Sequence, residues 1–198
     1  MNQLDKQLQG INIYLIGMMG CGKTTVGQAL AKELGYRFMD TDKLITQATN
    51  QSINQIFAQS GEAEFRTIES QVLSQLCAYQ RLIVATGGGI VLKKINWSYL
   101  RHGLIVWLDV PVEQLYKRLK GDKTRPLLQK PDPLGTLQHL LDQRKSLYKA
   151  ADLRIRVNPA DSPQQTMQKI VTAIPSVLKS PDQSPTKTLT EPPNIDQN

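Results

Sequence analysis

Five short apolar runs divide the chain into segments of the length that strands adopt. They cover residues 11–16, 36–39, 82–86, 104–110 and 153–157, and longer amphipathic stretches lie between them. Regular alternation of strands with helices favours a parallel sheet that is covered by helices on both faces. The pattern therefore predicts an α/β fold in three layers, with a five-stranded parallel sheet in the middle.

The amphipathic stretches carry signals for where helices begin and end. The helix that follows the first strand is expected to end at Gly35, since glycine adopts the left-handed conformation common after a last helical turn. Ser52, with Gln55 three residues later, has the form of a capping box and predicts a helix through Ala58. Helical spacing resumes over residues 62–76, and Pro175 is expected to end or kink the final helix.

Two segments lack such periodicity. Residues 120–133 combine three prolines with several basic side chains, which predicts a mobile lid between two helices. Residues 180–198 contain four prolines and few apolar side chains, which is typical of a disordered tail. Residues 1–179 are therefore expected to form a single domain.

Composition restricts the class of protein. Of the 198 residues, 40% are hydrophobic and 21% are charged, as in ordinary globular domains. We find no apolar run of transmembrane length and no signal-sequence pattern, so we expect a cytoplasmic protein without a membrane partner. Cys21 and Cys77 are too few for a disulfide framework, and we expect both as reduced thiols.

The net charge of +7 is concentrated in one part of the chain. Residues 93–156 carry 14 basic side chains against six acidic ones, which accounts for the whole imbalance. A basic surface suits a nucleic acid and an anionic small ligand equally well. Charge alone leaves both classes of ligand open.

The segment after the first strand holds a phosphate-binding pattern. Residues 17–24, GMMGCGKT, fit G-x-x-x-x-G-K-[ST] between a predicted strand and a predicted helix. Glycines allow backbone N–H groups to point at a phosphate, and the helix N-terminus adds positive potential. Lys23 is expected to reach the β- and γ-phosphates and Thr24 to bind Mg²⁺. The alternative is a tight turn with an incidental lysine.

Two carboxylates follow the second strand at the edge where ligands bind in such sheets. Asp40 and Asp42 are expected to divide the work, one near Mg²⁺ and one at a hydroxyl acceptor. If the chain stays extended here, both side chains point to the same side. The alternative for either residue is a turn or a helix N-cap.

Other candidates lie further along the chain. Arg66 and Glu69 are three residues apart on one helical face, either as a solvated ion pair or as a glutamate that fixes an arginine toward an anionic substrate. Gly87, Gly88 and Gly89 follow the third strand, either as an ordinary loop or as backbone that a substrate approaches closely. Arg125 and Arg144 complete the set of candidate anion-binding residues.

Taken in order, these motifs resemble the shikimate kinase family from residue 11 to about residue 174. The series is GMMGCGKTT, DTD, SINQIF leading into GEAEFRTIE, GGG, RPLL and RKSLYKAAD. The resemblance implies transfer of phosphate from ATP to shikimate, which gives shikimate 3-phosphate on the route to chorismate and the aromatic amino acids. It also implies the cofactor Mg²⁺.

The resemblance also assigns roles to residues. Gly20, Cys21, Gly22, Lys23, Thr24 and Thr25 would bind the ATP phosphates, Arg118 would lie against adenine and Arg125 would close over the phosphates. Thr24 and Asp40 would hold Mg²⁺, with Asp40 acting through water. Asp42 would hold the reacting hydroxyl, Arg66 and Arg144 the carboxylate, and Gly87, Gly88 and Gly89 the ring hydroxyls. Lys23, Asp42 and Arg125 would be the catalytic residues. The loop from Asn158 matches only loosely, and no nucleotide contact is assigned there.

Two other functions remain open at this point. A different P-loop kinase, acting on gluconate or a nucleoside monophosphate, would share the phosphate loop without needing the other motifs. An ATP-switched regulator that binds nucleic acid would explain the basic segment, although no nucleic-acid module is recognisable in it. We expect a monomer that acts on a small molecule and binds no nucleic acid.

Overall fold

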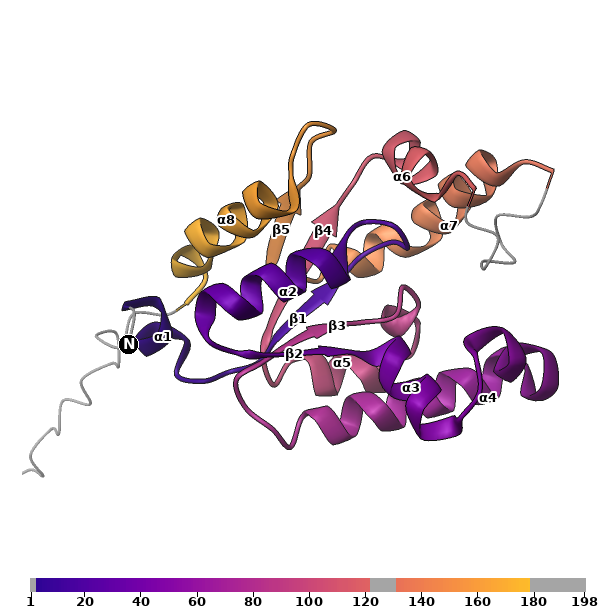
Figure 1. Cartoon of the computed structure of the whole chain (residues 1–198), viewed down its shortest axis with the longest axis horizontal. Coiled ribbons are helices and arrows are strands. Elements are labelled where there is room, and N and C mark those ends of the chain that lie inside the picture. Colours follow the sequence, from indigo (N-terminus) through magenta and orange to yellow (C-terminus); the bar gives the residue numbers. More distant parts are fainter. Residues whose placement is uncertain (1–2, 122–130, 179–198) are drawn as a thin grey trace, which may run out of the picture.

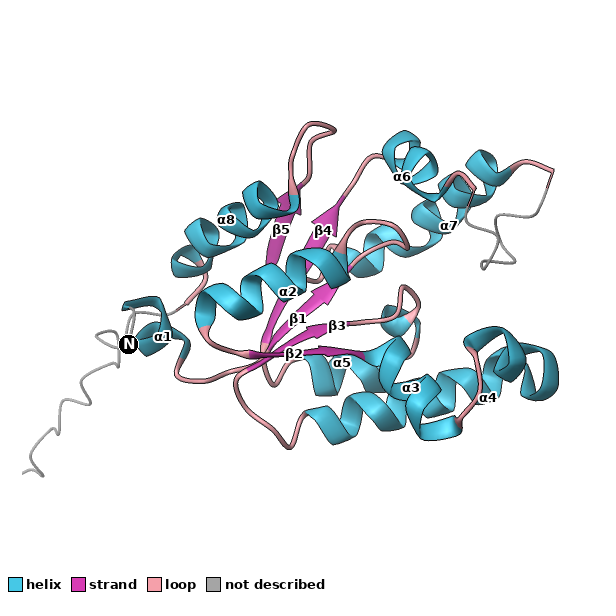
Figure 2. Cartoon of the chain, viewed as in Figure 1, coloured by secondary structure: helices cyan, strands magenta, loops and turns pink. Residues whose placement is uncertain are grey.

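Five parallel strands form the centre of the molecule (Figures 1 and 2). The computed structural model describes residues 3–121 and 131–178. Its strands are β1 (Ile13–Ile16), β2 (Arg37–Asp40), β3 (Leu82–Ala85), β4 (Leu104–Asp109) and β5 (Leu153–Arg156). They pair in the order β2-β3-β1-β4-β5, and every pair is parallel. The predicted five-stranded parallel sheet is confirmed.

Helices cover both faces of this sheet. They are α1 (Gln3–Leu8), α2 (Lys23–Leu34), α3 (Thr41–Thr49), α4 (Ile53–Leu76), α5 (Lys94–Leu100), α6 (Val112–Leu119), α7 (Pro133–Tyr148) and α8 (Pro163–Ala173), with short 3₁₀ turns η1 (Ile90–Leu92) and η3 (Ile174–Ser176). Helices α2 and α8 pack together on one face, and α4, α5 and α7, which all contact η1, cover the other (Figure 1). This is the predicted three-layer arrangement.

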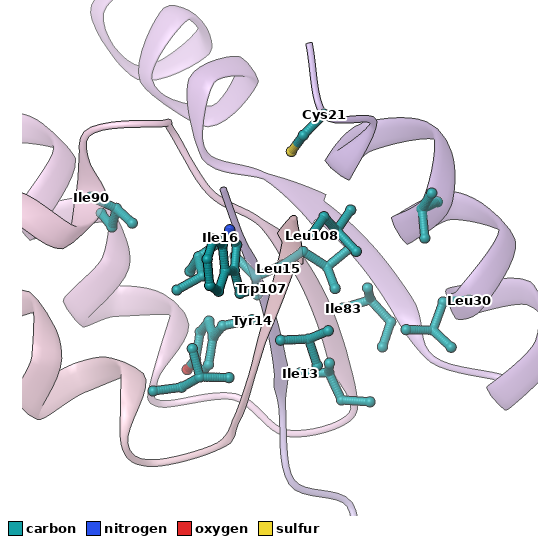
Figure 3. Close-up of a cluster of buried hydrophobic side chains, with 14 of the residues drawn as sticks. Ile13, Tyr14, Leu15, Ile16, Cys21, Leu30, Ile83, Ile90, Trp107 and Leu108 are labelled. Atoms are coloured by element: carbon teal, nitrogen blue, oxygen red, sulfur yellow. The ribbon is translucent and has the colours of Figure 1, made fainter. Parts of the chain in front are cut away.

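The burial of each strand follows from its place in the sheet. The central strands β1 and β3 are buried at every position, because helices cover both of their faces. The edge strand β5 instead alternates buried and exposed residues. Figure 3 shows the core between β1, β4 and the helices, with Tyr14 and Trp107 among its largest side chains. This rigid sheet carries the loops at its carboxyl edge.

Local signals fixed several helix ends as predicted. Gly35 ends α2 with φ 66°, and Ser52 and Gln55 form the expected capping box at the start of α4. The two helical stretches predicted over residues 53–76 are merged into α4, with a kink at Gly61, where φ is 78°. The last helix stops at Ala173, and Pro175 lies in the 3₁₀ turn that follows.

Helix α1 was not predicted from the polar N-terminal sequence. It buries Leu4 and Leu8, which lie one helical turn apart, and its Asp5 forms an ion pair of 3.0 Å with Arg81. The helix therefore packs through a narrow apolar stripe that consists of these two leucines.

Most of the predicted lid at 120–133, namely residues 122–130, lies outside the described residues, and so does the predicted tail at 180–198. Within the described ranges, none of the helices combines the length and the apolar character needed to cross a lipid bilayer.

Candidate active site

A cleft of about 490 Å³ opens at the carboxyl edge of the sheet. Loops that follow four of the five strands contribute to it: the loop after β1, the Asp40–Asp42 segment after β2, Thr86 and Gly88 after β3, and Val157 with Asp161 after β5. Residues separated by more than a hundred positions in the chain therefore meet at one edge, as expected for an open parallel α/β sheet. The predicted phosphate loop and both aspartates line this cleft.

The phosphate loop wraps around the ammonium group of Lys23. Lys23 Nζ donates to the carbonyl oxygens of Gly17 and Met18 at 2.9 and 3.0 Å, and it lies 3.6 Å from Cys21 Sγ. Gly20 and Gly22 have φ values of 74° and 100°, which L-residues with a side chain rarely adopt. The loop ends at the N-terminus of α2, and residues 19–26 line the cleft, so the positive end of the helix dipole lies beside it.

Cys21 and Cys77 are both free thiols, as predicted. Cys21 is buried against the loop and still lines the cleft, consistent with its predicted place among the phosphate-binding residues.

Asp40 connects the phosphate loop to the segment after β2. Its Oδ2 accepts a hydrogen bond of 2.8 Å from Thr24 Oγ1, and its Oδ1 accepts from the backbone amides of Asp42 and Lys43. Asp40 is thus the N-cap of α3 as well as the partner of Thr24. The helix N-cap that the sequence left open for this residue is therefore confirmed, and its second carboxylate oxygen contacts Thr24 in the cleft.

The expectation of an extended chain through Asp42 is wrong. Helix α3 begins at Thr41, directly after β2, so Asp42 lies in the first helical turn. The N-cap bonds of Asp40 turn the chain at this point. Asp42 still lines the cleft, and its Oδ1 lies beside Gly87.

Three predicted substrate-binding residues surround the glycine loop at residues 87–89. A Cβ atom on Gly87 would lie 3.0 Å from Asp42 Oδ1, and one on Gly89 would overlap the guanidinium group of Arg66. Arg144 Nη1 donates to the Gly88 carbonyl at 3.1 Å. None of these glycines has a positive φ. Glycine is therefore needed at positions 87 and 89, because side chains of α3 and α4 occupy the space that a Cβ would take, whereas a Cβ on Gly88 would meet nothing closer than 3.5 Å.

Arg66 is fixed by two carboxylates on its own helix. It pairs with Glu69 at 2.8 Å and with Glu62 at 3.0 Å. Burial by itself would lower the pKa of Arg66, but the two carboxylates outweigh burial and raise it above its ordinary value. The guanidinium therefore stays charged in a half-buried place, as a group that binds an anionic substrate must.

Glu69 is fully buried behind Arg66. Its Oε2 accepts from Arg66, while its Oε1 has no hydrogen-bond partner among the described residues. Burial raises the pKa of Glu69, although Arg66 acts in the opposite direction. Glu69 is therefore a buried partner that holds Arg66 from behind, and the alternative of a solvated ion pair does not apply to it.

The structure places Arg118 at the edge of the phosphate loop. Its Nη1 lies 3.3 and 3.4 Å from the carbonyl oxygens of Gly20 and Cys21, and the side chain lines the cleft. Thr25 lines it as well. Arg125, the remaining predicted site residue, lies outside the described residues.

One wall of the cleft was missed from the sequence. Val157, Asp161, Pro163 and Thr166 line it next to the phosphate loop, although no nucleotide contact was assigned after Asn158. Asp161 is held by Lys169 and by the backbone amide of Asn158. The only sequence signal was position, since this loop follows the last strand and therefore ends at the same edge as the others.

Comparison with known proteins identifies the family. The family model described as shikimate kinase matches residues 19–175. A shikimate kinase of Nostoc sp. is 66% identical over 172 residues, which cover 87% of this chain and 95% of that protein. The chain belongs to the shikimate kinase family.

Solved structures agree with this membership. A shikimate kinase from Acinetobacter baumannii, in complex with shikimate, is 40% identical with a TM-score of 0.83, and the match covers 87% of this chain and 97% of that one. A gluconokinase from Sinorhizobium meliloti has a TM-score of 0.58 at 18% identity, with 85% and 94% covered. The second likeness concerns the fold alone, which the shikimate kinase family shares with other P-loop kinases.

Proposed function

We propose that the chain transfers the γ-phosphoryl group of ATP to the 3-hydroxyl of shikimate, forming shikimate 3-phosphate and ADP in the route to chorismate and the aromatic amino acids. The observation that carries the proposal is the set of three side chains around residues 87–89. Asp42, Arg66 and Arg144 come from α3, α4 and α7, and all contact one short loop beside the phosphate loop. Membership of the shikimate kinase family supports the same substrate.

Residues 20–25 would bind ATP, the phosphoryl donor. Their backbone amides and the N-terminus of α2 would hold the ATP phosphates. An ammonium group has three donors, and all those of Lys23 now face loop atoms. A bound phosphate would take over at least one of them, which would place positive charge on the group that is transferred. Arg118 would lie against adenine. Arg125 would close over the phosphates, as the resemblance to the family implies.

The acceptor side needs opposite charges at its two ends. Shikimate is a polyol with one carboxylate, and a pair of arginines suits that carboxylate. Asp42 would hold the reacting hydroxyl at the other end, either as its general base or as a hydrogen-bond acceptor that positions it. Gly87, Gly88 and Gly89 would let the ring approach the backbone. Phosphoryl transfer requires alignment and charge neutralisation more than a covalent intermediate, and these groups supply both.

The oxygen atoms of Thr24 and Asp40 fit Mg²⁺. They lie 2.8 Å apart in the cleft, and the described residues contain no cluster of three metal-binding side chains. Mg²⁺ in kinases usually takes one or two protein oxygens and completes its shell with water and substrate phosphates. When bound, the ion neutralises charge on the phosphate oxygens. Thr24 would be a direct ligand, and Asp40 would act through water.

We also propose a monomeric cytoplasmic enzyme that binds no nucleic acid. Four basic side chains lie around the cleft: Lys23, Arg66, Arg118 and Arg144. Two anionic small molecules bound there would neutralise their positive charge.

A parallel assay of ADP release tests the proposal. The purified chain is supplied with ATP and Mg²⁺ together with shikimate, quinate, gluconate or a nucleoside monophosphate. We expect rapid release with shikimate and little with the others. Turnover with gluconate or a nucleotide, and none with shikimate, would contradict the proposal. Strong, steeply salt-dependent binding of DNA or RNA would instead favour the regulator considered from the sequence.

A further inference from the structure

A fully buried tyrosine lies directly behind the proposed substrate loop. Tyr148 ends α7, one helical turn after Arg144, so the two side chains share a face of that helix. The Tyr148 hydroxyl donates to the Gly88 carbonyl at 2.9 Å, and Arg144 Nη1 donates to the same oxygen at 3.1 Å. One carbonyl thus has both of its acceptor sites filled from α7.

The same hydroxyl also reaches the phosphate loop. It lies 3.8 Å from Met18 Sδ, and the Met18 carbonyl accepts a hydrogen bond from Lys23. Burial raises the pKa of Tyr148, so the hydroxyl keeps its proton and remains a donor. Tyr148 therefore stands between the loop assigned to the acceptor and the loop assigned to the donor.

The ring of Tyr148 is held from the sheet side. It stacks on Trp107 of β4, with ring centroids 5.7 Å apart and an angle of 23° between the planes. Arg154 of β5 contacts the Trp107 ring at 4.8 Å and pairs with Asp109. Because Trp107 is itself almost completely buried, the position of the Tyr148 hydroxyl follows from the packing of the sheet.

We propose that Tyr148 is a positioning residue for phosphoryl transfer: its hydroxyl fixes the Gly88 carbonyl, and through it the distance between the glycine loop and the phosphate loop and the orientation of Arg144. The inference rests on the proposed function, because it concerns the alignment of shikimate with ATP. Small displacements of reacting groups are costly in a transfer that depends on alignment. The effect of losing the hydroxyl should therefore reach both substrate binding and turnover.

The test compares two buried tyrosines. Tyr148→Phe removes the hydroxyl and keeps the stacked ring. We expect KM for shikimate to rise and kcat to fall, each about three- to tenfold, as for the loss of one net hydrogen bond, while KM for ATP stays within about twofold. The control is Tyr14→Phe. Tyr14 of β1 is also fully buried, and its hydroxyl contacts Cys77 Sγ and the side chain of Asn12, neither of which lines the cleft. The Tyr14→Phe substitution should lower the thermal midpoint and leave kcat and both KM values unchanged.

A double variant examines the shared carbonyl. Because Tyr148 and Arg144 act on one oxygen, the loss in Tyr148→Phe with Arg144→Lys should be smaller than the product of the two single losses. Wild-type kinetics in Tyr148→Phe, with or without a lower thermal midpoint, would overturn the inference and leave the proposed function standing. A wild-type chain that does not phosphorylate shikimate would overturn both.

Discussion

Thr24 Oγ1 donates a hydrogen bond of 2.8 Å to Asp40 Oδ2, which ties the first turn of the helix after the phosphate loop to the end of the second strand. The other oxygen of Asp40 caps α3. One carboxylate therefore serves both the proposed metal site and the local fold. Substitutions can separate these two roles, since asparagine caps helices as well as aspartate does but binds a hydrated dication less well.

Asp40→Asn should raise the Mg²⁺ concentration needed for half-maximal rate and leave the thermal midpoint nearly unchanged. A Mg²⁺ titration at saturating ATP and shikimate, together with a thermal melt, measures both quantities. Asp40→Ala is the matched comparison, because it should show the same metal effect and also lose about 1 kcal/mol of stability from the missing cap. An unaltered Mg²⁺ requirement in both variants would remove Asp40 from the metal site.

Asp42→Asn should leave the Mg²⁺ requirement alone and lower kcat. An amide can still bond the hydroxyl but cannot take its proton. If Asp42 is the general base, we expect a loss of roughly 10²–10⁴-fold; if it only positions the hydroxyl, we expect a smaller loss with a raised KM for shikimate. Identical kinetic behaviour in the Asp40 and Asp42 variants would show that the two carboxylates do not divide the work.

Lys23→Ala should reduce turnover by about 10³-fold or more, because the ammonium group acts on charge that develops during transfer. The side chain also closes the loop on the Gly17 and Met18 carbonyls, so a modest fall in thermal midpoint is expected. Lys32→Ala, an exposed position on the same helix, serves as the control. A folded Lys23 variant that forms ADP at the wild-type rate would refute the phosphate-loop assignment.

Arg66→Lys should chiefly raise KM for shikimate. Lysine cannot contact Glu62, Glu69 and a substrate carboxylate together in the way that the guanidinium can, and the loss should be about 1.5–3 kcal/mol. KM for ATP should hardly change. Arg101→Lys, at an exposed arginine after α5, provides the control in the same assay. An equal rise in both Michaelis constants would point to a general distortion of the cleft.

Glu69→Gln should change how stability depends on pH. The pKa of Glu69 is raised in the folded protein above its ordinary value of 4.5, mainly by burial and despite Arg66. The folded state therefore holds this proton more tightly than the unfolded state, and the associated stability is lost as pH rises through the folded pKa. Arg66 and Arg144 oppose this shift, and Asp42 adds to it.

Thermal melts of both proteins from pH 4 to pH 8 measure this effect. The thermal midpoint of the Gln variant minus that of the wild type should increase as pH rises from 4 to 8, whatever its value at pH 4. Subtracting the two curves cancels the titration of other groups. A difference that moves the opposite way would mean that the ion pair with Arg66 outweighs burial.

Much of the site could be predicted because its signals are local. The glycines and Lys23 lie within eight consecutive residues, and strand–loop–helix order determines where such a loop falls. The apolar runs located all five strands and are clearest in β1, β3 and β4, because strands buried on both faces contain few polar residues. The candidates at residues 40, 66 and 144 were found in the same way, through the motifs around them.

What the sequence did not reveal depends on distant contacts or on very short patterns. Helix α1 has only two buried leucines, too few for a periodicity to stand out. The start of α3 directly after β2 follows from the capping bonds of Asp40, which compete with extension of the strand. Val157 and Thr166 join the cleft because α8 packs beside α2, a relation between segments more than a hundred residues apart.

Glycine is required for different physical reasons in the phosphate loop and in the loop at residues 87–89. At Gly22, φ is 100° and a Cβ atom would meet nothing closer than 3.8 Å, so the constraint is on backbone conformation. At Gly89 the backbone is ordinary and the Arg66 guanidinium fills the space. A library randomised at both positions should therefore recover glycine at both, with asparagine as the rare exception at 22, because it tolerates positive φ better than other residues with a side chain. Position 22 is thus restricted by its backbone conformation, and position 89 by the space that residue 66 fills, so a larger residue at 89 would also require a change at 66.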